Sequence, residues 1–215
     1  MKVKGINRMN KIQKVGVVVA AVVITASQAF ALTENWSAQL SRFLTLQGGT
    51  TGVPIGDLIE IGIVSNPGAA AAATTPAQLQ ALITVFASST VGTGTGIAGS
   101  FTVGSTAPGA GFFGGQVYLV AYNAATVAAA TQGGMFTDAT WLFPVSDGAA
   151  PGNMDLGDVG VSAPRGTLSS GTVTSPADIA GTDAASLAVF PVPEPSTWVL
   201  VGSSLLGLLA FRRRS

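Results

Sequence analysis

The segment Gln116-Val117-Tyr118-Leu119-Val120-Ala121-Tyr122 carries the strongest β-strand signal in the chain. Its side chains are apolar on both alternating faces, whereas a strand with one solvated face alternates apolar and polar positions. Its valine and tyrosine residues are of the types enriched in strands. The segment therefore predicts a central strand that is buried on both faces, with the rest of the domain arranged around it.

Shorter apolar segments, separated by glycine and proline, flank this strand on both sides. The β-branched segment 57–64 predicts a second strand, and strand character recurs at 100–103, 135–136, 139–143 and 186–190. Glycine, proline and aspartate dominate 146–171, which predicts a long surface loop with at most brief strands. Many short strands joined by turns are typical of an antiparallel β-sandwich, so we expect a mainly β, sandwich-like domain with one packed α-helix.

That helix is expected over residues 76–87. Thr75 is placed to cap it, Pro76 suits its first turn, and Gln78 has the spacing of a capping box. Apolar residues then recur on one face of a helix, namely Leu79, Leu82, Ile83 and Phe86. The alanine run at 69–73 buries little surface, and we interpret it as a loop.

The composition excludes several classes of site. The chain has 215 residues, of which 9% are charged and 28 are glycine, and it contains no cysteine and no histidine. Disulfides, histidine metal sites and Ser-His-Asp or Cys-His catalysis are therefore absent. Residues 32–190 hold nine acids but only two bases, Arg42 and Arg165, so this part has a net charge of −7. Neither nucleic acid nor an anionic membrane surface is an expected partner, because both require clustered cations.

Two loop patterns are candidates for ligand binding. The G-x-G-x-x-G pattern at 94–99 precedes a strand-like segment and is followed by no suitably placed acid, so we expect no dinucleotide site. The loop from Asp147 to Asp158, with Asn153 and Asp155 between them, contains oxygen ligands of the kind that calcium prefers. Its spacing is not that of an EF-hand. We favour solvated loop acids, and weak calcium binding by this loop stays open.

Carboxylates and aromatic rings offer two further alternatives. A glycosidase needs a pair of carboxylates, and Asp57, Glu60 and Asp138 could supply one, but nothing in the sequence selects a pair. Flat rings can line a sugar-binding surface, although core packing is the favoured interpretation; the rings concerned are Trp36, Trp141, Tyr118 and Tyr122. We therefore expect no enzyme activity, no cofactor and no metal site.

Residues 1–31 have the organisation of a secretory signal peptide. Five cations within residues 1–14 precede a short apolar core, and Ala29-Phe30-Ala31 forms an A-x-A site. We predict cleavage after Ala31 by signal peptidase, following export by the secretion machinery. An uncleaved anchor or a buried strand is the alternative, although the apolar run is short for a membrane span.

The C-terminal residues combine three features in a fixed order: Pro193-Glu194-Pro195, an uncharged apolar run at 197–211, and Arg212-Arg213-Arg214. As a helix the run spans roughly 22 Å, slightly short of a ~30 Å hydrocarbon core, and snorkelling arginines can cover the difference. The arginines act as a membrane stop and are expected to stay cytoplasmic, which places the body outside. The two prolines hold the backbone extended around Glu194.

This order of motif, helix and basic end resembles the PEP-CTERM sorting signal of exported bacterial proteins, over residues 191–215. The resemblance implies an exosortase, a membrane cysteine transpeptidase, as the partner that removes the helix. It also implies a Gram-negative-type bacterium that makes exopolysaccharide. An ordinary membrane anchor is the alternative. A GPI signal fits less well, because charged residues follow the apolar run and no polar spacer precedes it.

The expected organisation is thus a signal peptide (1–31), a β-rich extracellular passenger domain (32–190) and a sorting signal with a transmembrane helix (191–215). Such a protein is anchored transiently in the inner membrane and then reaches the cell surface or the exterior. We expect a structural or adhesion-type component of the surface or matrix, with extracellular polysaccharide as a candidate partner. A carbohydrate-binding or hydrolytic domain carrying the same signal is the rival hypothesis.

Overall fold

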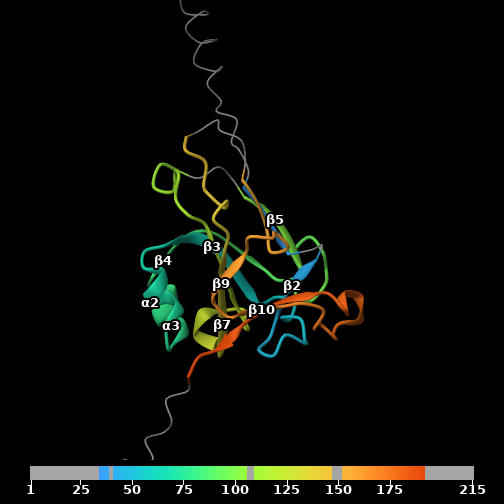
Figure 1. Ribbon diagram of the computed structural model, residues 1–215. Helices are drawn as coiled ribbons and strands as arrows, with labels where there is room; N and C mark the ends of the chain where they lie inside the picture. Colours follow the sequence, from blue (N-terminus) through green and yellow to red (C-terminus); the bar gives the residue numbers. More distant parts are fainter. Residues whose placement is uncertain (1–33, 39–40, 106–108, 147–151, 192–215) are drawn as a thin grey trace, which may run out of the picture.

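A six-stranded antiparallel sheet lies at the centre of the structure, a computed structural model that describes residues 34–38, 41–105, 109–146 and 152–191 (Figure 1). Its strand order is β12-β7-β6-β3-β4, and β9 also pairs with β7. The strands are β3 (Leu58–Val64), β4 (Ile83–Thr90), β6 (Tyr118–Tyr122), β7 (Gln132–Thr137), β9 (Ser162–Arg165) and β12 (Ala188–Val189). The mainly β fold predicted from the sequence is confirmed.

The strand β6 is the central strand that the sequence predicts. It pairs with β3 on one side and with β7 on the other, and all five of its residues are buried. Leu119 and Ala121 face one side of the sheet and pack into the main core. Tyr118, Val120 and Tyr122 face the other side, where a second core lies.

Two three-stranded sheets cover the first face. Their orders are β5-β1-β8 and β10-β11-β2, and each contains one parallel pair beside an antiparallel one. The strands are β1 (Glu34–Ala38), β2 (Arg42–Thr45), β5 (Phe101–Ser105), β8 (Asn153–Asp155), β10 (Thr167–Ser169) and β11 (Asp183–Ser186). Trp36, Leu44 and Phe101 from these sheets meet Ile59 and Phe136 from the central sheet in the main core.

Short helices cover the second face: α2 (Pro67–Ala71), α3 (Pro76–Gln80) and the 3-10 turn η1 (Val127–Ala129). A further 3-10 turn, η2 (Ala177–Ile179), packs beside β2 and β11. Figure 1 shows α2 and α3 on the opposite side of the molecule from β2, β5 and β10. Ala70 of α2 and Leu79 of α3 are buried in the second core with Tyr122.

The predicted helix over 76–87 begins correctly but ends too late. The Thr75 side chain caps it by accepting a hydrogen bond from the Gln78 amide, at 3.2 Å. The helix ends at Gln80, and β4 begins at Ile83 and pairs with β3. Because Ile83 and Val85 are β-branched and β3 offers a ladder, strand pairing prevails over the helical period. There are thus two short helices among the described residues instead of one.

Three other predictions need correction. The alanine run assigned to a loop contributes to α2, whose first turn is capped by Asn66. Segment 139–143 forms a turn and a single bridge, Gln116 to Leu142, instead of a strand. Strand β1 was not expected from the sequence. The brief strands expected within 146–171 are present as β8, β9 and β10.

Candidate functional site

The described chain leaves the domain at Val189 and Phe190, directly before the C-terminal motif. Strand β12 pairs with β7 through Ala188 opposite Gly133 and Val189 opposite Gln132. The Phe190 amide then donates to the Thr131 carbonyl, at 2.9 Å. A two-residue strand forms few ladder hydrogen bonds, so other contacts are needed to hold this segment to the body.

Arg165, at the end of β9, supplies these contacts. Its buried guanidinium donates to four backbone carbonyls: Nε to Gly133 at 3.2 Å, Nη1 to Ala71 at 3.2 Å and Ala73 at 2.8 Å, and Nη2 to Val189 at 3.1 Å. These carbonyls belong to β7, to the end of α2 and the residues after it, and to β12. One side chain therefore ties the last strand to two other parts of the fold.

The Phe190 ring completes this arrangement, which we call the C-terminal clamp: Arg165, Gly133, Val189 and Phe190. The guanidinium carbon lies 4.1 Å from the ring centroid, a cation–π geometry. A Cβ atom at Gly133 would lie 2.8 Å from the ring, so only glycine leaves room for Phe190. The sequence reasoning missed the clamp, although Arg165 is one of only two bases in residues 32–190. An isolated cation in a chain with so few charges was the available signal.

Titratable groups surround the clamp on the helix-covered face. Burial lowers the pKa of Arg165. Burial raises the pKa of Tyr122, and the nearby Glu60 raises it further, while the Tyr122 hydroxyl donates to Gln80 Oε1 at 2.8 Å. Burial also raises the pKa of Glu60, which a hydrogen bond with Gln80 partly offsets. Burial thus disfavours the ionised form of Glu60 in this apolar core.

The carboxylates that might form a glycosidase pair are kept apart by the sheet. The strand register places Asp57 beyond the Tyr122 end of β6 and Asp138 beyond the Tyr118 end. The five residues of β6 span about 15 Å at a strand rise of ~3.3 Å, which exceeds the 5–9.5 Å separation typical of glycosidases. Glu60 lies on the face covered by the helices. Asp57 and Asp138 therefore lack the required geometry.

The four aromatic rings considered for sugar binding are all buried: Trp36, Trp141, Tyr118 and Tyr122. Trp36 packs against Phe101, with ring centroids 5.6 Å apart. The Trp141 indole donates to Asp158 Oδ2 at 2.9 Å. The core interpretation of these rings is confirmed, and they form no exposed sugar-binding surface.

The acidic loop uses its carboxylates to order its own backbone. Asp155 accepts hydrogen bonds from the Ser37 hydroxyl and, at 2.6 Å, from the Gly157 amide. Asp158 accepts from the Asp155 amide at 3.3 Å in addition to the Trp141 indole. Asp147 lies outside the described residues. In the described ranges no group of three or more His, Cys, Asp or Glu side chains is placed to hold a metal ion.

The glycine pattern at 94–99 forms the turn between β4 and β5. Gly94, Gly96 and Gly99 all have positive φ angles, and the following element is a strand. A dinucleotide-binding loop opens a helix, whose N-terminus binds the phosphates. The segment is therefore a connecting turn.

The residues predicted to direct export and processing lie outside the described ranges: Ala29, Ala31, Pro193, Glu194, Pro195, Arg212, Arg213 and Arg214. The same applies to the signal helix and to the span predicted at 197–211. Among the described residues, no helix combines the length and the apolar character needed to cross a bilayer.

Comparison with protein families identifies residues 191–214 as a PEP-CTERM protein-sorting motif. No curated protein and no solved structure matches the chain. The matched segment begins one residue after Phe190, so it follows directly on the C-terminal clamp. It contains the Pro-Glu-Pro tripeptide, the apolar run and the arginines that carry the resemblance noted in the sequence. The chain therefore carries a PEP-CTERM protein-sorting motif, the signal of an exported protein sorted by an exosortase.

Proposed function

We propose that this protein is a structural or adhesion-type component of the cell surface or of an exopolysaccharide-associated matrix. Its C-terminal helix anchors the exported body in the inner membrane until an exosortase acts at Pro193-Glu194-Pro195. The enzyme's thiolate attacks a peptide carbonyl near this motif and forms a thioester with the body, while the helix leaves with a new, protonated amino terminus. Water then releases the body, or an acceptor nucleophile attaches it.

The observation that carries this proposal is the position of the C-terminal clamp, directly before the sorting motif. The C-terminal clamp holds the chain through Phe190, and the sorting motif begins at residue 191. The contacts of the clamp hold the last strand at Val189 and Phe190, on the body's side of the motif. Removal of the motif therefore leaves these contacts in place, as expected of a cleavable segment attached to a folded domain.

The short connection between the body and the apolar run supports a transient anchor. Six residues, 191–196, separate Phe190 from the apolar run that begins at Thr197. At full extension this connection spans roughly 25 Å. The folded body is therefore held close to the bilayer until the cut, and moves away from it only afterwards.

The character of the body supports a function by contact. Residues 61–137 contain no charged side chain, and the strand register keeps Asp57 and Asp138 too far apart for glycoside hydrolysis. The rival carbohydrate-binding hypothesis gains no support from Trp36 or Trp141, because both rings are buried. Glycan-array binding or sugar release by the purified body would favour the rival.

The test compares cells with and without the exosortase, by fractionation and by the intact mass of the product. We expect loss of both termini only where the enzyme is present, and Glu194→Ala should block the second cut while the first, after Ala31, proceeds. Ser196→Ala is the matched control and should be processed normally. A mature product that keeps Trp198 to Arg214 in the presence of a functional enzyme contradicts the proposal.

A further inference from the structure

Four described segments around Phe190 contain no charged residue. We call the surface that they form the exit face and define it by segments 46–50, 65–81, 123–132 and 188–191. None of them contains Asp, Glu, Lys or Arg. Most of its exposed side chains are small or neutral polar ones, such as Gln47, Gln78, Ala128 and Thr131, and the apolar Val189 is exposed as well. Figure 1 shows α3, η1 and the 46–50 turn gathered at the end of the molecule where the red C-terminal strand leaves it.

Hydrogen bonds and packing contacts join these segments into one surface. The Gln47 amide donates to Gln132 Oε1 at 2.8 Å, and the Phe190 amide to the Thr131 carbonyl. Arg165 binds the residues that end α2, and α3 packs against η1. The segments therefore hold a fixed arrangement around Phe190.

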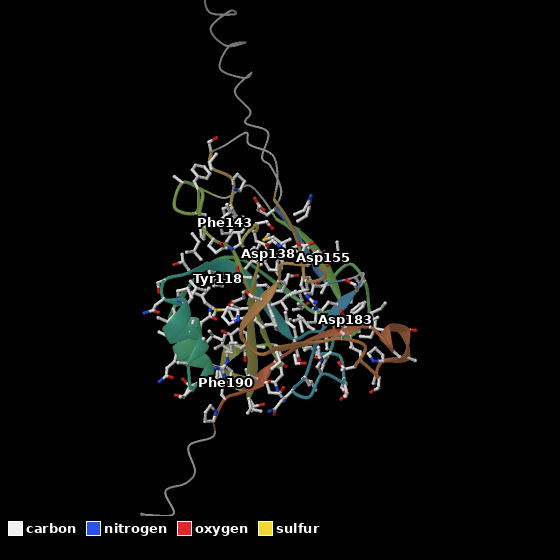
Figure 2. All side chains as sticks on the ribbon, in the orientation of Figure 1. Tyr118, Asp138, Phe143, Asp155, Asp183 and Phe190 are labelled. Atoms are coloured by element: carbon white, nitrogen blue, oxygen red, sulfur yellow. The ribbon has the colours of Figure 1, made fainter. Side chains whose placement is uncertain are left out.

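Charged groups at this end of the domain are withdrawn from solvent. Asp57, Glu60 and Arg165 have exposed fractions of only 9%, 6% and 7%. Other carboxylates lie elsewhere: Figure 2 shows Asp138, Asp155 and Asp183 well away from Phe190, while Phe143 marks the opposite end of the domain. These three carboxylates are thus kept away from Phe190.

We propose that the exit face is the side of the body that rests against the lipid headgroups while the chain is still anchored. This inference rests on the membrane anchoring in the proposed function. The six residues from 191 to 196 oblige some face of the body to lie within roughly 25 Å of the bilayer. The exit face is the nearest one, because the connection starts at its centre.

Electrostatics explains why this face is neutral. Bacterial membranes contain anionic lipids, and a body with a net charge of −7 is repelled at short range. Screening reduces the repulsion beyond a Debye length of about 8–10 Å. A domain of this size is roughly 40 Å across, so carboxylates at its sides and far end are screened. The body as a whole is not attracted to the membrane, as the sequence indicates; the short connection holds its neutral face there.

The absence of native cysteine allows a direct test. Ala128→Cys places a single thiol on the exit face, and Ala110→Cys places one on an exposed alanine near Phe143, at the opposite end. Each thiol carries a fluorophore on the uncut chain, reconstituted in phosphatidylglycerol-containing vesicles with a quencher attached to the headgroups. We expect severalfold stronger quenching at position 128 than at position 110.

The outcomes separate this inference from the proposed function. Equal quenching at both positions, or stronger quenching at position 110, contradicts the proposal that the exit face rests on the headgroups but leaves the anchoring intact. A chain that does not float with the vesicles overturns the anchoring and the inference together. The charge variant Ala128→Glu should reduce quenching from a probe on Thr131→Cys at low salt, with recovery at high salt, whereas Ala110→Glu should not. A loss of quenching that does not depend on salt contradicts an electrostatic cause. So does an Ala128→Lys variant that reduces quenching as much as Ala128→Glu.

Discussion

The guanidinium of Arg165 lies over the ring of Phe190, 4.1 Å from its centroid, and the same side chain donates to the carbonyl of Val189. We predict that Arg165→Met lowers the free energy of unfolding of the body by about 2–4 kcal/mol, because several buried carbonyls lose their donor. Urea denaturation of residues 32–191 measures this change. Methionine retains much of the side-chain volume, so loss of packing contributes little.

Arg42→Met is the matched control. Arg42 is half-buried, forms one 3.9 Å ion pair with Asp183 and donates one hydrogen bond to the Leu156 carbonyl. Its replacement should cost about 1 kcal/mol, as expected for a partly exposed pair and one hydrogen bond. If the two variants lose similar stability, the clamp is not the special contact that its geometry indicates.

The position of the clamp also predicts where the chain can be shortened. A body that ends at Pro191 should unfold at the same urea concentration as the same body extended to Ser196, because both keep the clamp contacts of Val189 and Phe190. A body that ends at Leu187 loses β12 and two of the partners of Arg165, Val189 and Phe190, so its midpoint should fall markedly. Equal midpoints for bodies ending at Leu187 and Pro191 would show that the last strand is dispensable.

The sequence was most informative where local pattern and tertiary environment agree. The run at 116–122 is apolar on both faces, and β6 is indeed the buried central strand. The Thr75 cap and Pro76 correctly predict where α3 begins. The predicted end of α3 was wrong, because residues 83–90 fit the residue pattern of a helix as well as that of a strand. Only the presence of β3 decides between the two.

Of the candidate site, only the sorting motif could be predicted from the sequence. The order of Pro193-Glu194-Pro195, apolar run and arginines is a local feature, and family comparison confirms it. The clamp depends on β9, β7, α2 and β12 meeting in space, and no local pattern connects Arg165 to Phe190. The exit face likewise consists of four segments that are separate in sequence, so its neutrality becomes visible only in the fold.

Buried carboxyl groups give the domain a definite pH dependence. Burial raises the pKa of Glu60, Asp57 and Glu34 above their ordinary values of 4.5, 3.8 and 4.5. The folded state then binds more protons than the unfolded state at pH values between the ordinary and the raised pKa. The free energy of unfolding is therefore largest below the ordinary values and falls as the pH rises through the raised ones.

Replacement of Glu60 tests this sign. Glu60→Gln removes the carboxylate that must otherwise ionise in the core, and a glutamine can still bond to Gln80. We expect a gain in unfolding free energy of about 1 kcal/mol at pH 7 and a smaller gain below pH 4. Urea titrations at both pH values measure it, with Asp178→Asn at an exposed site as the control. A gain that is larger at low pH would show that the sign is wrong.

The indole of Trp141 offers a local probe of the acidic loop. Its hydrogen bond to Asp158 Oδ2 joins the segment after β7 to the turn after β8. Asp158→Ala leaves the buried indole nitrogen without this acceptor and should lower the free energy of unfolding by about 1–3 kcal/mol. Asp158→Asn keeps an acceptor and should lower it less. An alanine variant as stable as the native chain would make this bond irrelevant to the loop.

The same loop can be tested for calcium binding, because added calcium should raise the melting temperature only if the loop binds the ion.

The length of the connection after Pro191 links the two proposals and predicts opposite effects on them. Insertion of a twelve-residue Gly/Ser linker there adds roughly 20 Å of average reach, so the body is no longer held against the bilayer. Headgroup quenching at position 128 should fall towards its value at position 110, because the neutral exit face has no attraction of its own for lipid. The cut at the sorting motif should continue, since Pro193-Glu194-Pro195 and the membrane helix keep their spacing, and intact mass measures it in the same cells. Quenching that survives the linker would mean that the exit face binds lipid independently. A cut that stops would mean that the exosortase also reads the folded body.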